Sequence, residues 1–232
     1  MNQSIIIPAY NEQARIGTVL ANYCGHFPDE EIIVVCNGCS DNTPDIIRRV
    51  CSKHSQVRAL CFEEKLGKGG AIIEGFKVAR GDKVGFVDAD ESVEPDVVKR
   101  MFDALSNVDG VIASRKLKGS IILIKQPWQR MIASKIFNIL VRIMFGLNFK
   151  DTQCGAKVFK REAIKDVLGS LDAKGFEFDV ELLWKLNNKG YRVLEFPISW
   201  KHSEGSTFNL SNAPKMFSSL VRVRLGLSRI QE

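Results

Sequence analysis

The sequence contains 232 residues, of which 45% are hydrophobic and 26% are charged, so it can bury a sizeable core and suits one globular domain. That composition excludes a disordered or fibrous chain. The formal net charge is +6, but eight basic and no acidic residues lie between Arg115 and Lys150, so only 25 of the 33 basic residues oppose the 27 acidic residues elsewhere. The basicity is therefore local. In this segment the basic residues alternate with bulky apolar residues, a pattern that favours an anionic membrane surface as the partner and argues against nucleic acid.

Short apolar runs alternate with helical patterns through the first half of the chain. We expect five strands, at residues 4–8, 31–36, 57–62, 83–88 and 110–114. Between them, helical patterns begin at about Glu12, Pro44, Lys68 and Pro95. This alternation predicts an α/β fold in which helices flank a doubly wound, mostly parallel sheet.

The pattern changes after Arg115. We expect a cationic apolar segment at 121–147, a loop at 149–159, a helix around 178–190, a strand at 191–200 and a closing helix near 213–225. Basic side chains interrupt the cationic apolar segment, so it lacks the roughly 18 to 20 apolar residues of a membrane span. Amphipathic helices that lie on a membrane surface or pack on a partner fit this segment, and an ordinary core helix with solvated lysines is the alternative.

Polar loops follow four of the predicted strands, and in a parallel sheet such loops meet at the edge where ligands bind. They are 8–12, 37–43, 63–71 and 88–92. Asp88 and Asp90 are two residues apart, so in an extended segment their side chains share one side. Paired carboxylates suit Mg²⁺ or Mn²⁺ on a substrate diphosphate, although a solvated turn would give the same pair. Lys68 at a helix start suits a phosphate, while Tyr10 and Glu12 suit a nucleoside.

Six motifs in a fixed order resemble the family 2 glycosyltransferases of the GT-A fold: "IIIPAYNE", "IVVCNGCSDNT", "LGKGGAI", "VDADES", "ASRK" and "DTQCGAKVF". The resemblance is nearest to the polyprenyl (dolichyl) phosphate glucosyl- and mannosyltransferases and runs from about Ser4 to Ser206. It implies a nucleotide diphosphate sugar donor (UDP or GDP), a divalent metal and inversion at the anomeric carbon. We expect a single domain, 1–232, with a nucleotide-sugar-binding half (1–115) and an acceptor- and membrane-facing half (116–232).

The resemblance assigns roles to individual residues, with catalysis itself resting on Asp90, Arg115 and Arg130. By position, the implied roles are Pro8, Ala9, Tyr10 and Glu12 in the nucleoside pocket, Asn37 beside the base, Lys68 near the donor, Asp88 and Asp90 on the metal, Arg115 and Arg130 at the phosphates, and Lys201 closing over the donor. Where many relatives carry "DDGS", residues 36–39 read "CNGC", which leaves the choice between uridine and guanosine open. Ser92 stands where some relatives place a further metal ligand.

The sequence thus predicts a hexosyltransferase that acts on a polyprenyl phosphate. This acceptor is already anionic, so positioning and charge compensation would carry catalysis without a strong general base. Two alternatives remain: a family 2 enzyme with a soluble or polysaccharide acceptor, and a non-catalytic nucleotide-sugar-binding protein. Scattered cysteines and the lack of a signal-peptide pattern favour a cytoplasmic protein that is peripherally associated with the membrane. The sugar, the base and the oligomeric state stay open.

Overall fold

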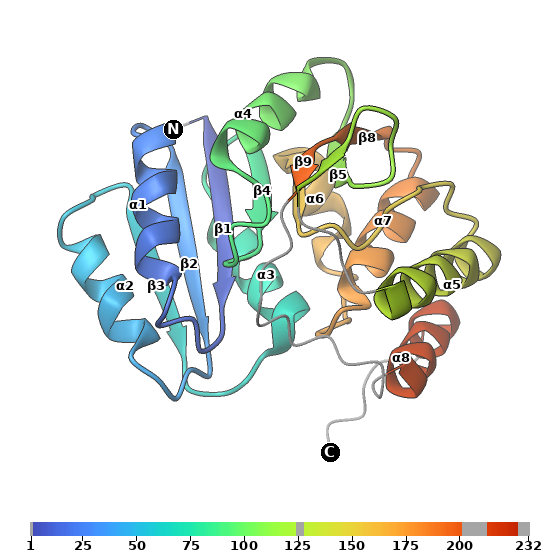
Figure 1. Cartoon of the computed structure of the whole chain (residues 1–232), viewed down its shortest axis with the longest axis horizontal. Helices are drawn as coiled ribbons and strands as arrows, with labels where there is room; N and C mark the ends of the chain where they lie inside the picture. The colour runs from blue at the N-terminus through green and yellow to red at the C-terminus, as the bar shows by residue number, and fades with distance from the viewer. Residues whose placement is uncertain (1, 124–127, 201–212, 227–232) are drawn as a thin grey trace.

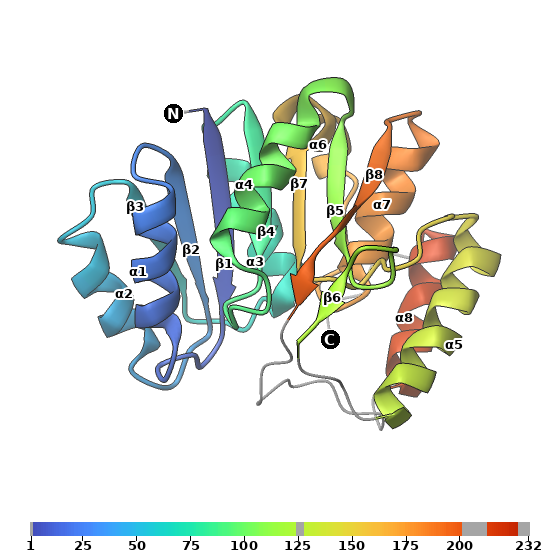
Figure 2. The same ribbon diagram turned by 45° about the horizontal axis from the view of Figure 1, so that its top comes forward.

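The computed structural model describes residues 2–123, 128–200 and 213–226, with the backbone alone at 128–133 and 213–216. A seven-stranded sheet has the order β3-β2-β1-β4-β7-β5-β8, and a two-stranded sheet pairs β6 with β9. Helices cover both faces of the large sheet (Figure 1 and Figure 2). The strands are β1 (Gln3–Ala9), β2 (Glu31–Asn37), β3 (Val57–Phe62), β4 (Lys83–Val87), β5 (Gly110–Ser114), β6 (Ile121–Ile122), β7 (Ala156–Lys160), β8 (Val193–Pro197) and β9 (Ser199–Trp200).

The first four predicted strands are confirmed and form the parallel part of the sheet. β1 pairs in parallel with β2 and β4, and β2 pairs in parallel with β3. Along β1, Ile5 and Ile7 belong to one core cluster and Ile6 to the other, as the alternation of side chains along a strand requires. Because helices cover both faces, the interiors of β1, β2 and β4 are apolar, which explains their continuous apolar runs in the sequence.

The loop predicted at 149–159 is wrong from residue 156 onward, where β7 begins. β7 lies between β4 and β5 and is antiparallel to both. Its second residue is Lys157, which is fully buried, and a lysine inside so short an apolar run hides the strand pattern. Because β7 separates β4 from β5, the fifth predicted strand pairs in parallel with β8 instead.

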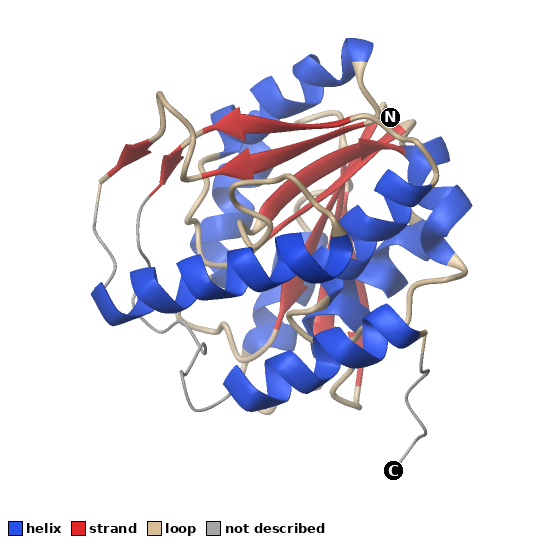
Figure 3. Cartoon of the chain, turned by 90° about the vertical axis from the view of Figure 1, so that its right-hand side faces the viewer, coloured by secondary structure: helices blue, strands red, loops and turns tan. Residues whose placement is uncertain are grey.

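Two helical layers enclose the sheet. One core cluster lies beneath α1, α2 and α4, and the other lies beneath α3, α6 and α7 and extends to α5 and α8. α5 and α8 lie side by side at the end of the molecule (Figure 1 and Figure 3), where Arg224 Nε donates to the carbonyl oxygen of Met144 at 2.9 Å. The helices are α1 (Ile16–His26), α2 (Thr43–Cys51), α3 (Gly67–Val78), α4 (Pro95–Asp103), the 3-10 helix η1 (Ala104–Asn107), α5 (Trp128–Phe145), α6 (Arg161–Leu168), α7 (Phe178–Asn188) and α8 (Ala213–Leu225).

Several boundaries differ from the predicted ones. α1 begins at Ile16 instead of about Glu12, and residues 13–15 form a turn in which the backbone N–H of Arg15 donates to the carbonyl oxygen of Glu12 at 3.0 Å. The strand predicted at 191–200 is divided into β8 and β9 at Pro197, which has no N–H for a sheet ladder. α6 was not predicted. No helix within the described ranges is long and apolar enough to cross a bilayer.

Candidate active site

A cleft of about 420 Å³ lies at the carboxyl edge of β1, β2 and β4, against the start of α3. The cleft gathers residues from all four loops that the sequence placed at this edge, as the topology of a parallel sheet requires. The predicted site residues that line it are Pro8, Ala9, Tyr10, Glu12, Asn37, Lys68, Asp88 and Asp90. The other lining residues, to which the sequence assigned no role in the site, are Arg15, Lys65, Gly67, Ala89, Gly175 and Phe176.

Asp88 follows β4 directly and is fixed by the chain that enters β7. Its backbone N–H donates to the carbonyl oxygen of Gly155 at 3.0 Å. A Cβ at position 155 would lie 1.9 Å from Asp88 Oδ2, so glycine is required there to make room for the carboxylate. Burial raises the pKa of Asp88 above its ordinary value; the ammonium of Lys68 opposes this shift and the carboxylate of Asp90 adds to it.

Asp90 belongs to a tight turn at the mouth of the cleft. Its Oδ1 accepts the backbone N–H of Ser92 at 3.0 Å, an arrangement typical of an Asx turn. Between them, Glu91 has a positive φ of 54°. Asp88 directly follows β4, and the turn then brings Asp90 back to the same cleft, so both carboxylates line it.

Lys68 connects the cleft to charged groups beneath it. Its Nζ lies 2.7 Å from Asp88 Oδ1 and 3.9 Å from Asp179 Oδ2. Burial alone would lower the pKa of Lys68, but the two carboxylates outweigh this effect and raise it. Lys68 is therefore a fixed positive charge at the floor of the cleft, where a phosphate of a ligand can be neutralised.

The glycines around Lys68 serve packing. The backbone N–H groups of Gly69 and Gly70 donate to the carbonyl oxygen of Lys174 at 2.9 and 3.4 Å. Gly67 has a φ of +79°, and a Cβ there would lie 2.2 Å from the same oxygen. The amides of Gly69 and Gly70 at the start of α3 already have a protein acceptor, so the side chain of Lys68 is the group in this segment that can bind a phosphate.

The opposite end of the cleft has features suited to a nucleoside. Lys65 Nζ lies 3.8 Å from the centroid of the half-exposed Tyr10 ring. Asn37 Oδ1 accepts the backbone N–H of Leu66 at 2.6 Å, so this amide orders the loop beside Lys65. With its oxygen engaged, Asn37 has its side-chain NH₂ as the group that can meet a ligand.

Glu12 is held by Arg15, a residue that the sequence pattern did not indicate as part of the site. Arg15 Nε and Nη2 donate to the two carboxylate oxygens of Glu12 at 2.6 and 3.1 Å. The hydrogen bond to Glu12 is the largest influence on the pKa of Arg15, which it raises, and the charge of Asp90 raises that pKa further. The three-residue spacing of an acid and a base was the available signal, but such pairs are common at helix starts.

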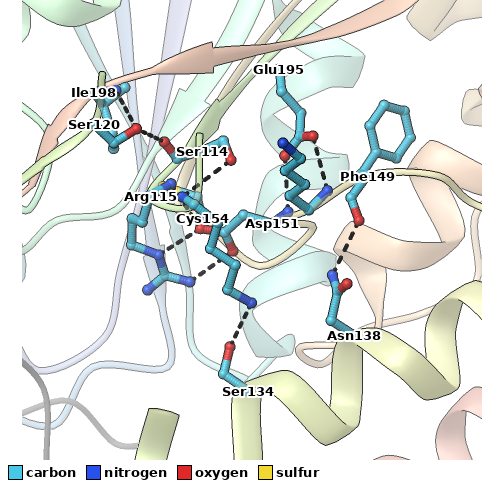
Figure 4. Close-up of polar contacts among 12 residues, drawn as sticks. Ser114, Arg115, Ser120, Ser134, Asn138, Phe149, Asp151, Cys154, Glu195 and Ile198 are labelled. Atoms are coloured by element: carbon cyan, nitrogen blue, oxygen red, sulfur yellow. Dashed lines mark hydrogen bonds and ion pairs between the residues drawn. The ribbon is translucent and has the colours of Figure 1, made fainter. Parts of the chain in front are cut away.

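A second polar cluster lies at the end of β5 (Figure 4). Arg115 Nε and Nη2 donate to Asp151 at 2.7 and 2.9 Å, and the backbone N–H of Arg115 donates to the same carboxylate at 3.0 Å. Glu195 in turn accepts the backbone N–H groups of Lys150 and Asp151, both at 2.9 Å. Arg115 also lies 5.2 Å from the ring centroid of Trp200. The structure thus anchors Arg115 firmly, outside the residues that line the cleft.

The Asp151→Asn variant is expected to lose about 3 kcal/mol of unfolding free energy, because it leaves Arg115 without its anionic partner. Burial would raise the pKa of Asp151, but Arg115 outweighs it and lowers that pKa. The stabilisation from Asp151 is therefore complete above the ordinary aspartate pKa of about 3.9 and is lost as the pH falls through the lower folded-state value. Urea titrations between pH 3 and 7 should show this pH-dependent loss in the wild type and a shallower loss in the variant. An equal change of unfolding free energy with pH in the two proteins would contradict the stabilising role of the Asp151 carboxylate.

Comparison with known proteins identifies the family. A family model described as glycosyl transferase family 2 matches residues 4–168. The chain belongs to glycosyl transferase family 2. The dolichyl-phosphate β-glucosyltransferase of Saccharomyces cerevisiae is 32% identical to it over 246 residues, which covers 96% of this chain and 74% of that protein. The polyprenol monophosphomannose synthase of Mycolicibacterium smegmatis is 29% identical over 215 residues, which covers 90% of this chain and 81% of that protein.

Solved structures agree on the fold of this family 2 glycosyltransferase. Glucosyl-3-phosphoglycerate synthase from Mycobacterium tuberculosis, in complex with Mg²⁺ and uridine diphosphate, has a TM-score of 0.71 at 20% identity and covers 99% of this chain and 81% of that one. The same enzyme with Mn²⁺, UDP-glucose and phosphoglyceric acid has a TM-score of 0.68 at 19% identity, with the same shares covered. These likenesses confirm the predicted GT-A fold.

The roles of all the predicted site residues stay predictions, and the structure describes no side chain for two of them. Lys201 lies outside the described residues, and so does the side chain of Arg130, whose backbone is part of α5. The predicted metal site rests on the two carboxylates of the cleft: within the described residues, no group of three or more His, Cys, Asp or Glu side chains could hold a metal ion. Asp88 and Asp90 therefore supply two carboxylates to the cleft, and Ser92 is engaged through its backbone in the Asp90 turn.

Proposed function

We propose that this family 2 glycosyltransferase moves a hexose, glucose or mannose, from a nucleotide diphosphate sugar (UDP or GDP) to a polyprenyl or dolichyl phosphate, with inversion at the anomeric carbon. The observation that carries the proposal is the cleft at the carboxyl edge of the sheet, where Asp88, Asp90 and Lys68 meet. Carboxylates for a metal and a lysine for a phosphate are the groups that a nucleotide sugar needs at its diphosphate. Relatives named for dolichyl phosphate and polyprenol support the acceptor.

Asp88 and Asp90 would hold Mg²⁺ or Mn²⁺, and their chemistry fits such an ion. Both are hard oxygen donors in one cleft, and Mg²⁺ is usually bound by one or two carboxylates together with substrate phosphates and water. The ion would act as a Lewis acid that neutralises the departing nucleoside diphosphate. The protein's own contribution at this end of the donor is Lys68, while Tyr10, Lys65 and Asn37 hold the nucleoside.

The acceptor phosphate needs charge compensation more than a base, since its oxygen is already anionic and can attack the anomeric carbon directly. Arg115 suits this role. Among the described residues, Asp151 accepts from Nε and Nη2 of Arg115, which leaves Nη1 available for a phosphate oxygen. Asp151 thereby fixes the orientation of the guanidinium before the acceptor binds.

The protein should be incubated with Mn²⁺ or Mg²⁺, a panel of UDP and GDP sugars, and either a short polyprenyl phosphate or soluble sugars and phosphate esters. We expect a glycolipid from one donor and no product with soluble acceptors. Transfer to a soluble acceptor alone would favour the second type of family 2 enzyme. Binding of a donor with no transfer to any acceptor would favour a non-catalytic nucleotide-sugar-binding protein.

We further propose that the acceptor is met at the cytosolic face of the membrane, through α5 and α8. On α5, Ile136, Ile139 and Ile143 are 55%, 56% and 76% exposed, and Arg142 lies on the same helix. α8 adds the exposed Phe217 and Leu225. The surrounding segment 115–150 has no acidic residue. Exposed apolar side chains among cations match an anionic lipid surface.

The Ile143→Asp variant is expected to bind anionic vesicles about tenfold more weakly than the wild type, because it removes an exposed apolar side chain and adds a repelled charge. The measurement is co-sedimentation with phosphatidylglycerol-containing liposomes at low and high salt. Leu194→Asp is a matched control, since Leu194 is 51% exposed but lies on the edge strand β8. Equal binding by Ile143→Asp and the wild type would remove α5 from the proposed membrane face.

A further inference from the structure

Four side chains of alternating charge form a chain from the interior to the cleft: Lys157, Asp179, Lys68 and Asp88. Lys157 Nζ lies 2.5 Å from Asp179 Oδ1, Lys68 Nζ lies 3.9 Å from Asp179 Oδ2, and Lys68 Nζ lies 2.7 Å from Asp88 Oδ1. The side-chain exposure increases along the chain, from 0% and 1% to 17% and 33%. The four groups come from β7, α7, α3 and the loop after β4.

The inner pair is anchored on both sides. Lys157 also donates to the carbonyl oxygen of Cys154 at 2.7 Å and lies 5.4 Å from the centroid of the Phe86 ring. With these contacts, Lys157 holds Oδ1 of Asp179 and leaves Oδ2 turned toward Lys68. Buried ion pairs are weak evidence for stability, because desolvation offsets most of the Coulomb attraction. Their presence under a substrate cleft is therefore better explained by a role in the cleft.

Lys68 is shared unequally between two carboxylates. It is within hydrogen-bond distance of Asp88, and 3.9 Å from Asp179 it retains a Coulomb attraction without a hydrogen bond. An ammonium that pairs with Asp88 competes directly with any cation for the same carboxylate. A second anion behind Lys68 reduces that competition, because it offers the ammonium another partner as a cation approaches Asp88.

We propose that Asp179, anchored by Lys157, is a positioning residue that draws Lys68 away from Asp88 and so lets Asp88 bind a divalent cation. The inference rests on the proposed function only in that Asp88 is a cation ligand. It assigns a role in the cleft to two buried residues that line no part of it. The competing explanation is that the Lys157–Asp179 pair merely ties α7 to β7.

The test is the affinity of the full chain for Mn²⁺, measured by electron paramagnetic resonance of the free ion in four proteins: wild type, Asp179→Asn, Lys68→Met and the double variant. We expect Asp179→Asn to weaken binding about tenfold, a value typical for removal of a group that orients a metal ligand. In the Lys68→Met background the same substitution should change binding less than threefold, because the competitor for Asp88 is gone. An equal loss in both backgrounds, or no loss in either, would overturn the proposal.

A second variant separates positioning from folding. Lys157→Met/Asp179→Asn removes both inner charges, so it leaves no unpaired ion in the interior, and it should show the same weakened Mn²⁺ binding as Asp179→Asn with a melting temperature near that of the wild type. Wild-type affinity in this variant would overturn the proposal.

The Asp88→Asn variant distinguishes a failure of the role of Asp179 from a failure of the metal site itself. If Asp88→Asn binds Mn²⁺ as the wild type does, both fail; if only Asp88→Asn loses binding, the role of Asp179 fails and the metal site stands.

Discussion

Asp88→Asn is expected to lower kcat/KM for sugar transfer by about 10³-fold, the scale seen when a group that stabilises developing charge is removed. The amide keeps the size of the carboxylate, so the contacts with Gly155 are preserved. It cannot hold a divalent cation as a carboxylate does, and Lys68 loses the partner at 2.7 Å. Initial rates at saturating polyprenyl phosphate, with the donor varied, measure the loss.

A suitable control for this variant is Asp96→Asn. Asp96 has the same chemistry, but its side chain is 72% exposed and it lies in the first turn of α4. We expect Asp96→Asn to retain wild-type rates and both variants to unfold at similar urea concentrations. If Asp88→Asn transfers sugar at the wild-type rate, or if excess chelator leaves the wild-type rate unchanged, the metal assignment is wrong.

The residues at the carboxyl ends of the strands could be predicted from the sequence because the topology determines their positions. Alternating strands and helices require a parallel sheet, and a parallel sheet brings the ends of its strands to one edge. Ala9, Asn37 and Asp88 are far apart in the chain, yet each ends or follows a predicted strand, and all three line the cleft. Their roles toward a donor remain proposals, since the geometry assigns them a place and a chemistry.

The groups that support the cleft could not be predicted in the same way. Gly155 and Lys157 reach Asp88 and Asp179 because β7 inserts between β4 and β5 in the opposite direction. Nothing in a five-residue sequence with lysines at its second and last positions indicates an antiparallel strand at the centre of a sheet. Such a lysine is ordinarily expected at the surface, and its burial is explained by its pairing with Asp179 at 2.5 Å and its hydrogen bond to the carbonyl oxygen of Cys154 at 2.7 Å.

For Arg115, the residue itself could be predicted from the sequence, but its pairing with Asp151 could not. A basic residue directly after β5 was an expected phosphate ligand, but its bidentate pairing with Asp151 links positions 36 residues apart. Propensity and periodicity describe neighbours within a few turns, so they contain no information on such a pair. The pairing alters the interpretation: Arg115 is a preoriented charge, held at three points by one carboxylate.

Gly155→Ala is expected to lower kcat/KM by about 10²-fold, through displacement of Asp88. The added Cβ would lie 1.9 Å from Asp88 Oδ2 and 2.3 Å from its Cγ, so the carboxylate must move by more than an ångström. A misplacement of that size in a catalytic group costs about 10²-fold in rate. Overpacking of this kind also destabilises the fold by about 1–3 kcal/mol, so rates must be measured well below the melting temperature.

The matched control for this effect is Gly169→Ala, because a Cβ at position 169 meets no atom within 4 Å. We expect Gly169→Ala to match the wild type in both rate and stability. The two effects of Gly155→Ala separate by temperature: lost stability is harmless in the cold, whereas a displaced carboxylate lowers the rate at every temperature. Recovery of the wild-type rate on cooling would show that position 155 acts through stability alone, and that Asp88 tolerates the shift. A persistent deficit, together with weakened Mn²⁺ binding, would tie the glycine of the "DTQCG" segment to the carboxylate it makes room for.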